Sequence, residues 1–322
     1  MTLLTVENLT VTFPGRAGVV HAIEDVNLSV APGEILGMVG ESGAGKSMTG
    51  AAIIGLIEPP GRITKGKITL EEQRIDTLRP EAMRRIRGRK IGAIFQDPLT
   101  SLNPVLTVGE QLIETIQTHL KLSKVEARER AIDWLRRVGI PAPEARIDTY
   151  PHQYSGGMRQ RVVIALALCA EPSLVIADEP TTALDVSVQA QIIALLRKLA
   201  RETGVAVLLV THDMGVIAET ADRVAVMYAG RIVEIGAVEE VLTNPKHPYT
   251  SGLMASIPRI GPRPDQLAQI EGAMPRPNAR PAGCAFGPRC PHRMEICGQQ
   301  RPELRTTQLD SVACHLQEEV SA

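Results

Sequence analysis

The segment Gly40-Glu-Ser-Gly-Ala-Gly-Lys46-Ser47 has the residue types and spacing of a phosphate-binding loop. It follows the apolar run Ile35–Val39, which predicts a buried strand, and it precedes residues 48–54, which predict the start of a helix. Glycine lets successive backbone N–H groups turn toward one point, where a Cβ would block a phosphate. The helix N-terminus adds a partial positive charge. We therefore expect Lys46 to reach the outer phosphates of a nucleotide and Ser47 to place its hydroxyl on Mg²⁺.

A second apolar run, Leu174 to Ala177, ends in the acids Asp178 and Glu179. It predicts a strand with both carboxylates at its C-terminal end. Asp178 would hold Mg²⁺ through its water shell, and Glu179 would polarise an attacking water as a general base. Taken alone, two acids at a strand end are equally typical of an ordinary protein surface.

A third motif, Ser155-Gly156-Gly157-Met158-Arg159, stands directly before an apolar helix-like run. A hydroxyl and two glycines at a helix start form another anion cradle. In isolation the same residues would be interpreted as a simple helix cap. The phosphate-binding loop and the Asp178–Glu179 pair in the same chain favour the anion cradle.

The remaining pattern predicts an α/β fold with a mostly parallel sheet, because Val/Ile/Leu-rich runs alternate with helical segments. Expected strands include residues 173–178, 205–210 and 224–228, with a helix over 186–201. Capping boxes at Thr107–Glu110 and Ser123–Glu126 predict two helices. We expect these helices to belong to a mostly helical insert at about residues 97–155.

With these motifs, the chain resembles the ATP-binding subunits of ABC transporters. The resemblance extends from about Leu3 to Leu242. Six motifs of that family follow one another in the expected order. They are the Walker A loop (residues 40–47), the Q-loop glutamine Gln96, the signature motif (155–159), the Walker B strand (174–179), the D-loop Ala183-Leu184-Asp185 and the switch histidine His212.

The resemblance implies a P-loop NTPase fold with an antiparallel β subdomain, the helical subdomain and a C-terminal extension containing cysteines. It places the ATPase domain at residues 1–244 and the extension at 245–322. It also implies roles for individual residues. The catalytic residues would be Glu179, His212 and Gln96. Mg²⁺ would be bound by Ser47, Gln96 and Asp178. ATP would be contacted by Phe13, Gly40, Ser42, Gly43, Gly45, Lys46, Ser47, Gln96, Asp178, Ser155, Gly156, Gly157 and Asp185. Phe13 stands where the family usually has a tyrosine under the adenine ring.

In this family two ATPase domains meet head to tail and share each ATP. The signature residues Ser155 and Gly157 would therefore contact a nucleotide held mainly by a partner chain. The resemblance implies a second ATPase subunit, a related chain or a second copy, together with two membrane permease subunits and an extracytoplasmic substrate-binding protein. It places the chain at the cytoplasmic face of the inner (plasma) membrane, as a peripheral subunit.

The segments at residues 97–104 and 244–250 resemble the dipeptide and oligopeptide importer branch, and the D-type subunit in particular. We expect an ATP-hydrolysing motor for import of dipeptides or oligopeptides. The alternatives are a motor for nickel or another small solute, an exporter ATPase, and a soluble ABC ATPase that works outside transport.

Four of the five cysteines fall near the C-terminus, at Cys284, Cys290, Cys297 and Cys314, with five, six and sixteen intervening residues. Close Cys-x-x-Cys pairs, which zinc sites favour, do not occur there. We expect these four thiolates to hold a [4Fe-4S] cluster as a structural element, and the family resemblance supports this. Structural zinc, with His292 or His315 as a further ligand, is the runner-up, and reduced unligated cysteines remain possible. The fifth, Cys169, lies within an apolar run and is expected to pack as a small apolar residue.

Composition argues against a nucleic-acid-binding or membrane-spanning chain. The net charge is −1 and no basic stripe stands out, so a nucleic-acid partner is not expected. The N-terminus lacks the layout of a signal peptide, and no apolar stretch approaches the roughly 20 residues that span a bilayer. From this we expect a soluble cytosolic chain, whose membrane part would be supplied by other subunits.

Overall fold

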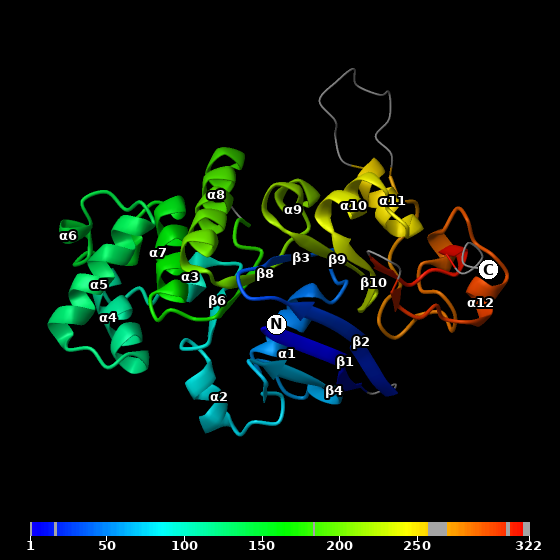
Figure 1. Cartoon of the computed structure of the whole chain (residues 1–322), viewed down its shortest axis with the longest axis horizontal. Helices are drawn as coiled ribbons and strands as arrows, with labels where there is room; N and C mark the ends of the chain where they lie inside the picture. Colours follow the sequence, from blue (N-terminus) through cyan, green and yellow to red (C-terminus); the bar gives the residue numbers. More distant parts are fainter. Residues whose placement is uncertain (1, 16–17, 183, 257–268, 307–309, 318–322) are drawn as a thin grey trace, which may run out of the picture. The chain divides into compact units, whose positions relative to one another are not determined.

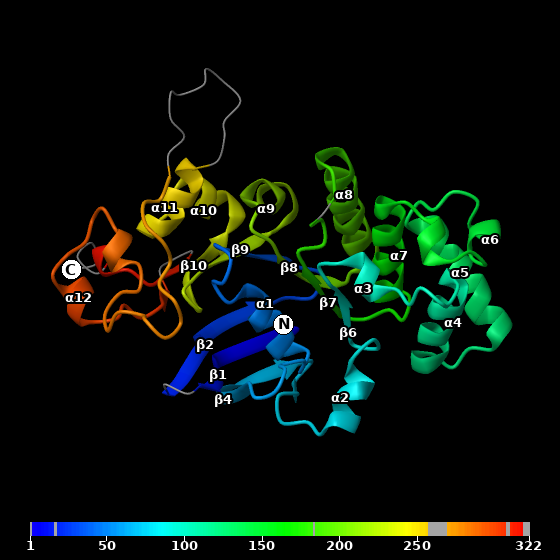
Figure 2. The ribbon, with the colours of Figure 1, turned by 180° about the vertical axis from the view of Figure 1, so that it is seen from behind.

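The computed structural model of the chain describes residues 2–15, 18–182, 184–256, 269–306 and 310–317. The chain packs as two compact units. The helical unit comprises Met1–Leu3, Val30–Ile35 and Thr77–Leu209, and the sheet unit comprises Leu4–Ser29, Leu36–Asp76 and Val210–Ala322. Figures 1 and 2 show the elements of each unit from two sides. Ala183 and parts of the predicted C-terminal extension lie outside the described residues.

The sheet unit contains an antiparallel sheet in the order β2-β1-β4-β5. In its register Leu4 lies opposite Leu70 and Val6 opposite Ile68, and all four side chains are buried. Glu71 and Glu72, with φ of 47° and 66°, make the tight turn between β4 and β5. The strands are β1 (Leu4–Gly15), β2 (Gly18–Val30), β4 (Arg62–Leu70) and β5 (Gln73–Arg74).

A second, mixed sheet of this unit runs in the order β11-β12-β10-β9-β3. β3 (Ile35–Val39) pairs in parallel with β9 (Arg223–Tyr228), and its five residues are all buried. This explains the uninterrupted apolar run in its sequence, because a strand covered on both faces needs no polar side. β10 (Arg231–Ala237) pairs antiparallel with β9, and β12 (Ser311–Val312) and β11 (Arg305–Thr306) extend the sheet beyond it.

Helices of the sheet unit pack around this second sheet. In both views α9 and α10 lie on one side of β9 and β10, and α1 lies on the other (Figures 1 and 2). The helices are α1 (Lys46–Ile53), α9 (Met214–Thr220), α10 (Val238–Thr243), α11 (Pro248–Ala255) and α12 (Ile296–Gln299), with short 3₁₀ turns η2 (Gly287–Arg289) and η3 (His315–Gln317).

The helical unit is built on the parallel pair β6 (Ile91–Ile94) and β7 (Leu174–Asp178), with β8 (Ala206–Val210) next to β7. The predicted strands at residues 173–178 and 205–210 are confirmed within one residue. The helix predicted over 186–201 begins at Val186 and ends two residues later than predicted, at Thr203. The helices are α2 (Pro80–Ile86), α3 (Pro98–Ser101), α4 (Val108–His119), α5 (Lys124–Arg137), α6 (Pro143–Arg146), η1 (Pro151–Gln153), α7 (Gly156–Leu168) and α8 (Val186–Thr203).

Both predicted capping boxes are present in the helical unit. The Thr107 hydroxyl accepts from the Glu110 amide, and the Glu110 carboxylate accepts from the Thr107 amide. Ser123 and Glu126 make the same reciprocal pair at the start of α5. The two longest helices within residues 98–153, α4 and α5, therefore begin where the local sequence predicts. Among the described residues, none of the helices has both the length and the apolar character that a membrane crossing requires.

Candidate nucleotide-binding site

The loop at residues 40–45 joins β3 to α1 in the sheet unit and has the backbone of an anion cradle. Gly40 and Gly45 have φ of 157° and 107°, which side-chain-bearing residues rarely adopt. A Cβ on Gly45 would lie 2.6 Å from Ile23 Cγ2, and a Cβ on Gly40 would collide with the Met227 carbonyl oxygen. The loop therefore accommodates only glycine at these two positions, as the motif predicts.

Lys46 opens α1, and its side chain bends back over the loop. Its Nζ donates to the carbonyl oxygens of Gly40 and Glu41, at 2.9 and 3.2 Å, and the residue is only 5% exposed. Ser42 and Gly43 are exposed on the same loop, and Ser47 is exposed in the first turn of α1. Gly45 is the N-cap of α1 and has no side chain, so no side-chain group caps the first turn. This arrangement suits a multiply charged phosphate, because the start of a helix and an ammonium lie beside an exposed stretch of loop backbone.

His212 lies in the same unit, just beyond the end of β8. The amide of the preceding Thr211 donates to the carbonyl of Met38 on β3, at 3.1 Å, two residues before Gly40. His212 is exposed, and Asp213 caps α9 by accepting from the amides of Gly215 and Val216. The predicted switch histidine is therefore held near the start of the phosphate-binding loop.

The helical unit brings Gln96 and Glu179 together at neighbouring strand ends. Ile94 pairs with Ala177 in the parallel β6–β7 ladder, so the residues that follow each strand emerge side by side. Gln96 Nε2 donates to Glu179 Oε2 at 3.2 Å, and Thr182 Oγ1 donates to the same oxygen at 2.9 Å. Asp178 ends β7 and is partly exposed.

Glu179 has a left-handed backbone, with φ of 47°, which is uncommon for a residue with a side chain. Such strain concentrates at functional sites, where the surrounding structure holds it. Sequence reasoning missed Thr182, whose hydroxyl helps to orient this carboxylate. The signal was available: a hydroxyl three residues after an acid, in a turn closed by the Thr182 amide donating to the Glu179 carbonyl at 3.1 Å.

Ser155 caps α7 by accepting from the Met158 amide at 3.3 Å, which is the role that these residues would have in isolation, and the predicted anion cradle stays a prediction. A Cβ on Gly157 would lie 2.8 Å from Val188 Cγ1, at the start of α8. The D-loop residue Asp185 caps α8, accepting from the Val188 amide and the Ser187 hydroxyl. Hydrogen bonds from Ser187 and Val188 lower the pKa of Asp185. Signature and D-loop residues thus pack together within the helical unit.

Phe13 lies near the end of β1, and its ring lies against Gly61. A Cβ on Gly61 would be 2.5 Å from two atoms of that ring. The ring is therefore partly covered from one side by the segment after α1, and its predicted place under an adenine stays a prediction.

The four C-terminal cysteines of the sheet unit converge, although they are spread over 31 residues of sequence. Cys284, Cys290, Cys297 and Cys314 line one small enclosed cavity of about 10 Å³, together with His247, His292 and His315. Burial, together with the neighbouring thiols, raises the pKa of Cys314 to about 11 and also raises that of Cys284. Among the described residues there is no group of three or more His, Cys, Asp or Glu side chains placed to hold a metal ion.

Cys169 behaves as predicted and stands apart from this cluster. It is fully buried at the end of α7, and burial raises the pKa of its thiol to about 12.

Comparison with known proteins decides the family. A family described as "ABC transporter" matches residues 23–182, and one described as "Oligopeptide/dipeptide transporter, C-terminal region" matches residues 233–297. The chain is 48% identical to the dipeptide transport ATP-binding protein DppD of Bacillus subtilis, over 98% of this chain and 95% of that one. The chain belongs to the ABC transporter ATP-binding family. This ABC ATPase is also 46% identical to DppD of Haemophilus influenzae, over 98% of this chain and 96% of that protein.

Solved structures confirm the predicted fold class of this ABC ATPase. The ATP-binding cassette MJ0796, in a dimeric post-hydrolysis state bound to ADP and Pi, matches with a TM-score of 0.66 and 31% identity. The match covers 73% of this chain and 99% of that one. A P-loop NTPase fold and ATP hydrolysis coupled to transport follow from the family.

Proposed function

We propose that this chain is the motor subunit of a membrane importer for dipeptides or oligopeptides. The observation that carries the proposal is that one chain matches both the ABC transporter family and the oligopeptide/dipeptide transporter C-terminal region. Curated relatives that are 46–49% identical to it bear the names of dipeptide and oligopeptide transport ATP-binding proteins. In this proposal residues 1–244 form the ATPase domain, with its helical subdomain at 97–155, and residues 245–322 form the extension.

The phosphate-binding loop would hold ATP mainly through its backbone. Backbone N–H groups at Ser42, Gly43 and Gly45 would surround the phosphates, and Lys46 would exchange the Gly40 and Glu41 carbonyls for phosphate oxygens. The cradle that a Cβ would fill fits this ligand. Ser47, Gln96 and Asp178 would hold Mg²⁺, which neutralises phosphate charge when bound. Phe13 would support the adenine ring.

Glu179 would act as the general base for the attacking water. The Gln96 and Thr182 hydrogen bonds keep its carboxylate in one orientation, so it needs little reorganisation to accept a proton. His212 would position the γ-phosphate and the water. Gln96 would also report γ-phosphate occupancy to the helices that follow it.

Ser155, Gly156, Gly157 and Asp185 would complete the site of a partner ATPase. Binding of ATP would close two ATPase subunits on each other, and hydrolysis would release them. Each nucleotide state would thus bias a two-state assembly that includes two permease subunits at the cytoplasmic face of the membrane. A substrate-binding protein outside the cytoplasm would deliver the peptide.

The first test is nucleotide-dependent association. Glu179→Gln protein should associate with its ATPase partner, or with itself, when Mg-ATP is added, as measured by analytical ultracentrifugation. Ser155→Arg in the same background is the matched control and should stay monomeric, because the bulky cation obstructs the borrowed half of the site. No association in any nucleotide state would contradict the shared site.

The second test identifies the transported solute. The proposed permease subunits are co-expressed with this chain, and the complex is reconstituted in liposomes with its binding protein. Dipeptides or oligopeptides should stimulate ATP hydrolysis, and chelated nickel should not. Stimulation by nickel alone would favour the alternative solute, and ribosome association without permeases would favour a soluble ABC ATPase.

We further propose that the four C-terminal cysteines ligate a [4Fe-4S] cluster, with Zn²⁺ as the runner-up. Four sulfur donors on one cavity suit such a cluster. The cavity is small, so a cluster would have to spread the segments that carry these thiols. Anaerobic purification should give about four irons per chain and a broad visible absorbance, both lost in Cys290→Ser but kept in the control Cys169→Ser. A colourless chain with one zinc would contradict the cluster.

A further inference from the structure

Within the sheet unit, an arginine from the cysteine segment (residues 284–297) forms hydrogen bonds with the phosphate-binding loop. Arg289 Nη1 donates to both carboxylate oxygens of Glu41, at 2.9 and 3.1 Å. Its Nε and Nη2 donate to the carbonyls of Glu271 and Ile270, at 2.9 and 3.2 Å. The Arg289 side chain is only 7% exposed. The guanidinium is therefore fixed by several partners, and Glu41 is one of them.

The position of Arg289 ties this contact to the cysteines. It ends the turn η2, between Cys284 and Cys290, and its amide donates to the Phe286 carbonyl at 2.9 Å. The Gly287 amide donates to the Cys284 carbonyl at 3.0 Å. Any change in how Cys284 and Cys290 are held would thus move the backbone that carries Arg289.

Glu41 is also held through its backbone. Its amide donates to the hydroxyl of Tyr249 at 3.0 Å, and Tyr249 is fully buried. Tyr249 packs against Tyr228 and Phe286, with ring centroids 4.6 and 5.5 Å away, and the Tyr228 hydroxyl accepts from Arg289 at 3.3 Å. An aromatic cluster therefore lies between the cysteine segment and the second residue of the loop.

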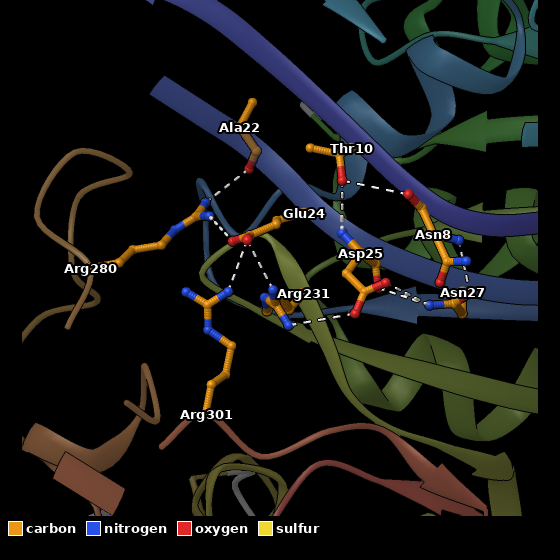
Figure 3. Close-up of polar contacts among 9 residues, drawn as sticks. All are labelled: Asn8, Thr10, Ala22, Glu24, Asp25, Asn27, Arg231, Arg280 and Arg301. Atoms are coloured by element: carbon orange, nitrogen blue, oxygen red, sulfur yellow. Dashed lines mark hydrogen bonds and ion pairs between the residues drawn. The ribbon is translucent and has the colours of Figure 1, made fainter. Parts of the chain in front are cut away.

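The extension supports the loop at a second place, through Glu24 of β2. Figure 3 shows Arg231, Arg280 and Arg301 converging on its carboxylate, with distances of 3.1, 3.8 and 2.9 Å. Burial alone would raise the pKa of Glu24, but hydrogen bonds and charges from Arg231 and Arg301 lower it.

Hydrogen bonds through Gly230 connect this cluster to the phosphate-binding loop. The Glu24 amide donates to the Gly230 carbonyl at 2.9 Å, and the Gly230 amide donates to the Ala44 carbonyl at 2.8 Å. Arg280 also donates to the Ala22 carbonyl at 3.0 Å (Figure 3). The extension thus braces the loop near both of its ends, at Glu41 and behind Ala44.

Glu41 connects this bracing to the predicted phosphate ligand. Its carbonyl accepts from Lys46 Nζ, and its carboxylate accepts from Arg289. We propose that Arg289 is a positioning residue for nucleotide binding, which couples the order of residues 284–297 to the conformation of the phosphate-binding loop through Glu41. The proposal rests on the assignment of residues 40–47 as the nucleotide loop.

The coupling has to be reciprocal, because two events that favour the same conformation favour each other. If an ordered cysteine segment tightens nucleotide binding, then nucleotide must stabilise that segment by the same factor. This reciprocity separates positioning from a merely structural role, in which loss of Arg289 would loosen the fold without linking the two events.

Affinity for Mg-ATP gives the first measurement, with a fluorescent ATP analogue and the full chain. Arg289→Gln and Glu41→Gln should each weaken binding by about tenfold, a typical coupling factor. The double variant should be no weaker than either single one, and Arg289→Lys should recover part of the loss. Arg74→Gln is the matched control, since it removes a comparable pair with Asp76 on the β4–β5 hairpin, and its affinity should match the wild type. Additive losses in the double variant would overturn the proposed pairing.

Hydrogen exchange gives the second measurement. Mg-ATP should slow exchange of residues 284–300 in the wild type and in Arg74→Gln, and should not do so in Glu41→Gln. Protection that is unchanged in Glu41→Gln would overturn the coupling. Lys46→Ala separates the two levels of the argument: normal affinity in that variant would refute the loop assignment itself, whereas weak binding there with normal binding in Arg289→Gln would refute only the role of Arg289. If Arg289→Gln does not fold, the Glu41→Gln and Arg289→Lys results decide.

Discussion

Gln96 donates from Nε2 to Oε2 of Glu179 over 3.2 Å, although 83 residues of sequence separate them. The parallel pairing of β6 and β7 makes this contact possible, because both residues follow strand ends at one edge. The Thr182 hydroxyl reaches the same carboxylate oxygen at 2.9 Å. The proposed base is therefore oriented by two hydrogen bonds, one from its own turn and one from the residue that follows the adjoining strand.

Glu179→Gln should nearly abolish ATP turnover and leave ATP binding intact. The amide keeps the shape of the side chain but cannot take a proton from water, and a positioned base contributes typically about 10²–10⁴-fold. Phosphate release and equilibrium binding of a fluorescent ATP analogue measure the two effects separately. Thr182→Val is a useful comparison, since it removes only the orienting hydroxyl and should reduce turnover by far less. Unchanged phosphate release by Glu179→Gln would remove Glu179 from the role of base.

Lys46→Ala should weaken nucleotide binding itself by at least about tenfold, because one charged hydrogen-bond donor to phosphate is lost. Lys46→Arg keeps the charge but changes the geometry, so it should bind better than the alanine variant and worse than the wild type. Binding is measured by calorimetry, with the thermal midpoint checked for each variant. Equal affinities across the three proteins would show that Lys46 does not touch phosphate.

Local sequence predicts a large part of this fold. Residues 40–47 predict the loop, because glycine is needed where φ is positive and a Cβ would collide. The apolar runs ending at Val39, Asp178 and Val210 predict buried strands to within a residue or two. Each of these signals needs only the chemistry of residues that are close in sequence.

Contacts between distant segments are the part that the residues alone do not predict. Gln96 became a candidate only through family resemblance, since nothing near it in sequence indicates a carboxylate partner. The Arg289–Glu41 pair spans 248 residues and was missed altogether. Its signal is not local, because Arg289 is one of many arginines and only the packing of the extension within the sheet unit brings it to Glu41.

The capping boxes allow a test of local stability in the helical unit. Ser123→Ala should lower the free energy of unfolding by about 1 kcal/mol, because the Glu126 amide at the start of α5 loses its acceptor. The chain's single tryptophan, Trp134, lies buried on the same helix and reports directly on it in urea titrations monitored by fluorescence. Thr118→Ala, at an exposed position on α4, is the matched control and should change the midpoint little. An equal effect of both substitutions would show that the cap contributes nothing specific.

The titration of His247 should make the sheet unit less stable in mild acid. It is 1% exposed at the N-cap of α11, where its Nδ1 accepts from the Tyr249 amide at 3.0 Å. Burial lowers the pKa of His247 to about 3, whereas an unfolded histidine titrates near 6.5. The unfolded chain therefore binds a proton first as pH falls. The stabilisation is complete above pH 6.5 and is lost progressively toward pH 3, by about 2 kcal/mol between pH 7 and pH 5.

Glu234 has to be separated from this effect, because it is a buried carboxylate that accepts from the His247 amide at 3.0 Å. Burial raises the pKa of Glu234, so its protonation favours the folded state as pH falls and opposes the histidine contribution. His247→Asn isolates the histidine term, since the asparagine oxygen can accept from the Tyr249 amide and cannot be protonated in this range. Urea unfolding followed by circular dichroism at pH 7 and pH 5 should show a smaller pH dependence in His247→Asn than in the wild type. The same loss of stability in both proteins would mean that His247 is not the group responsible.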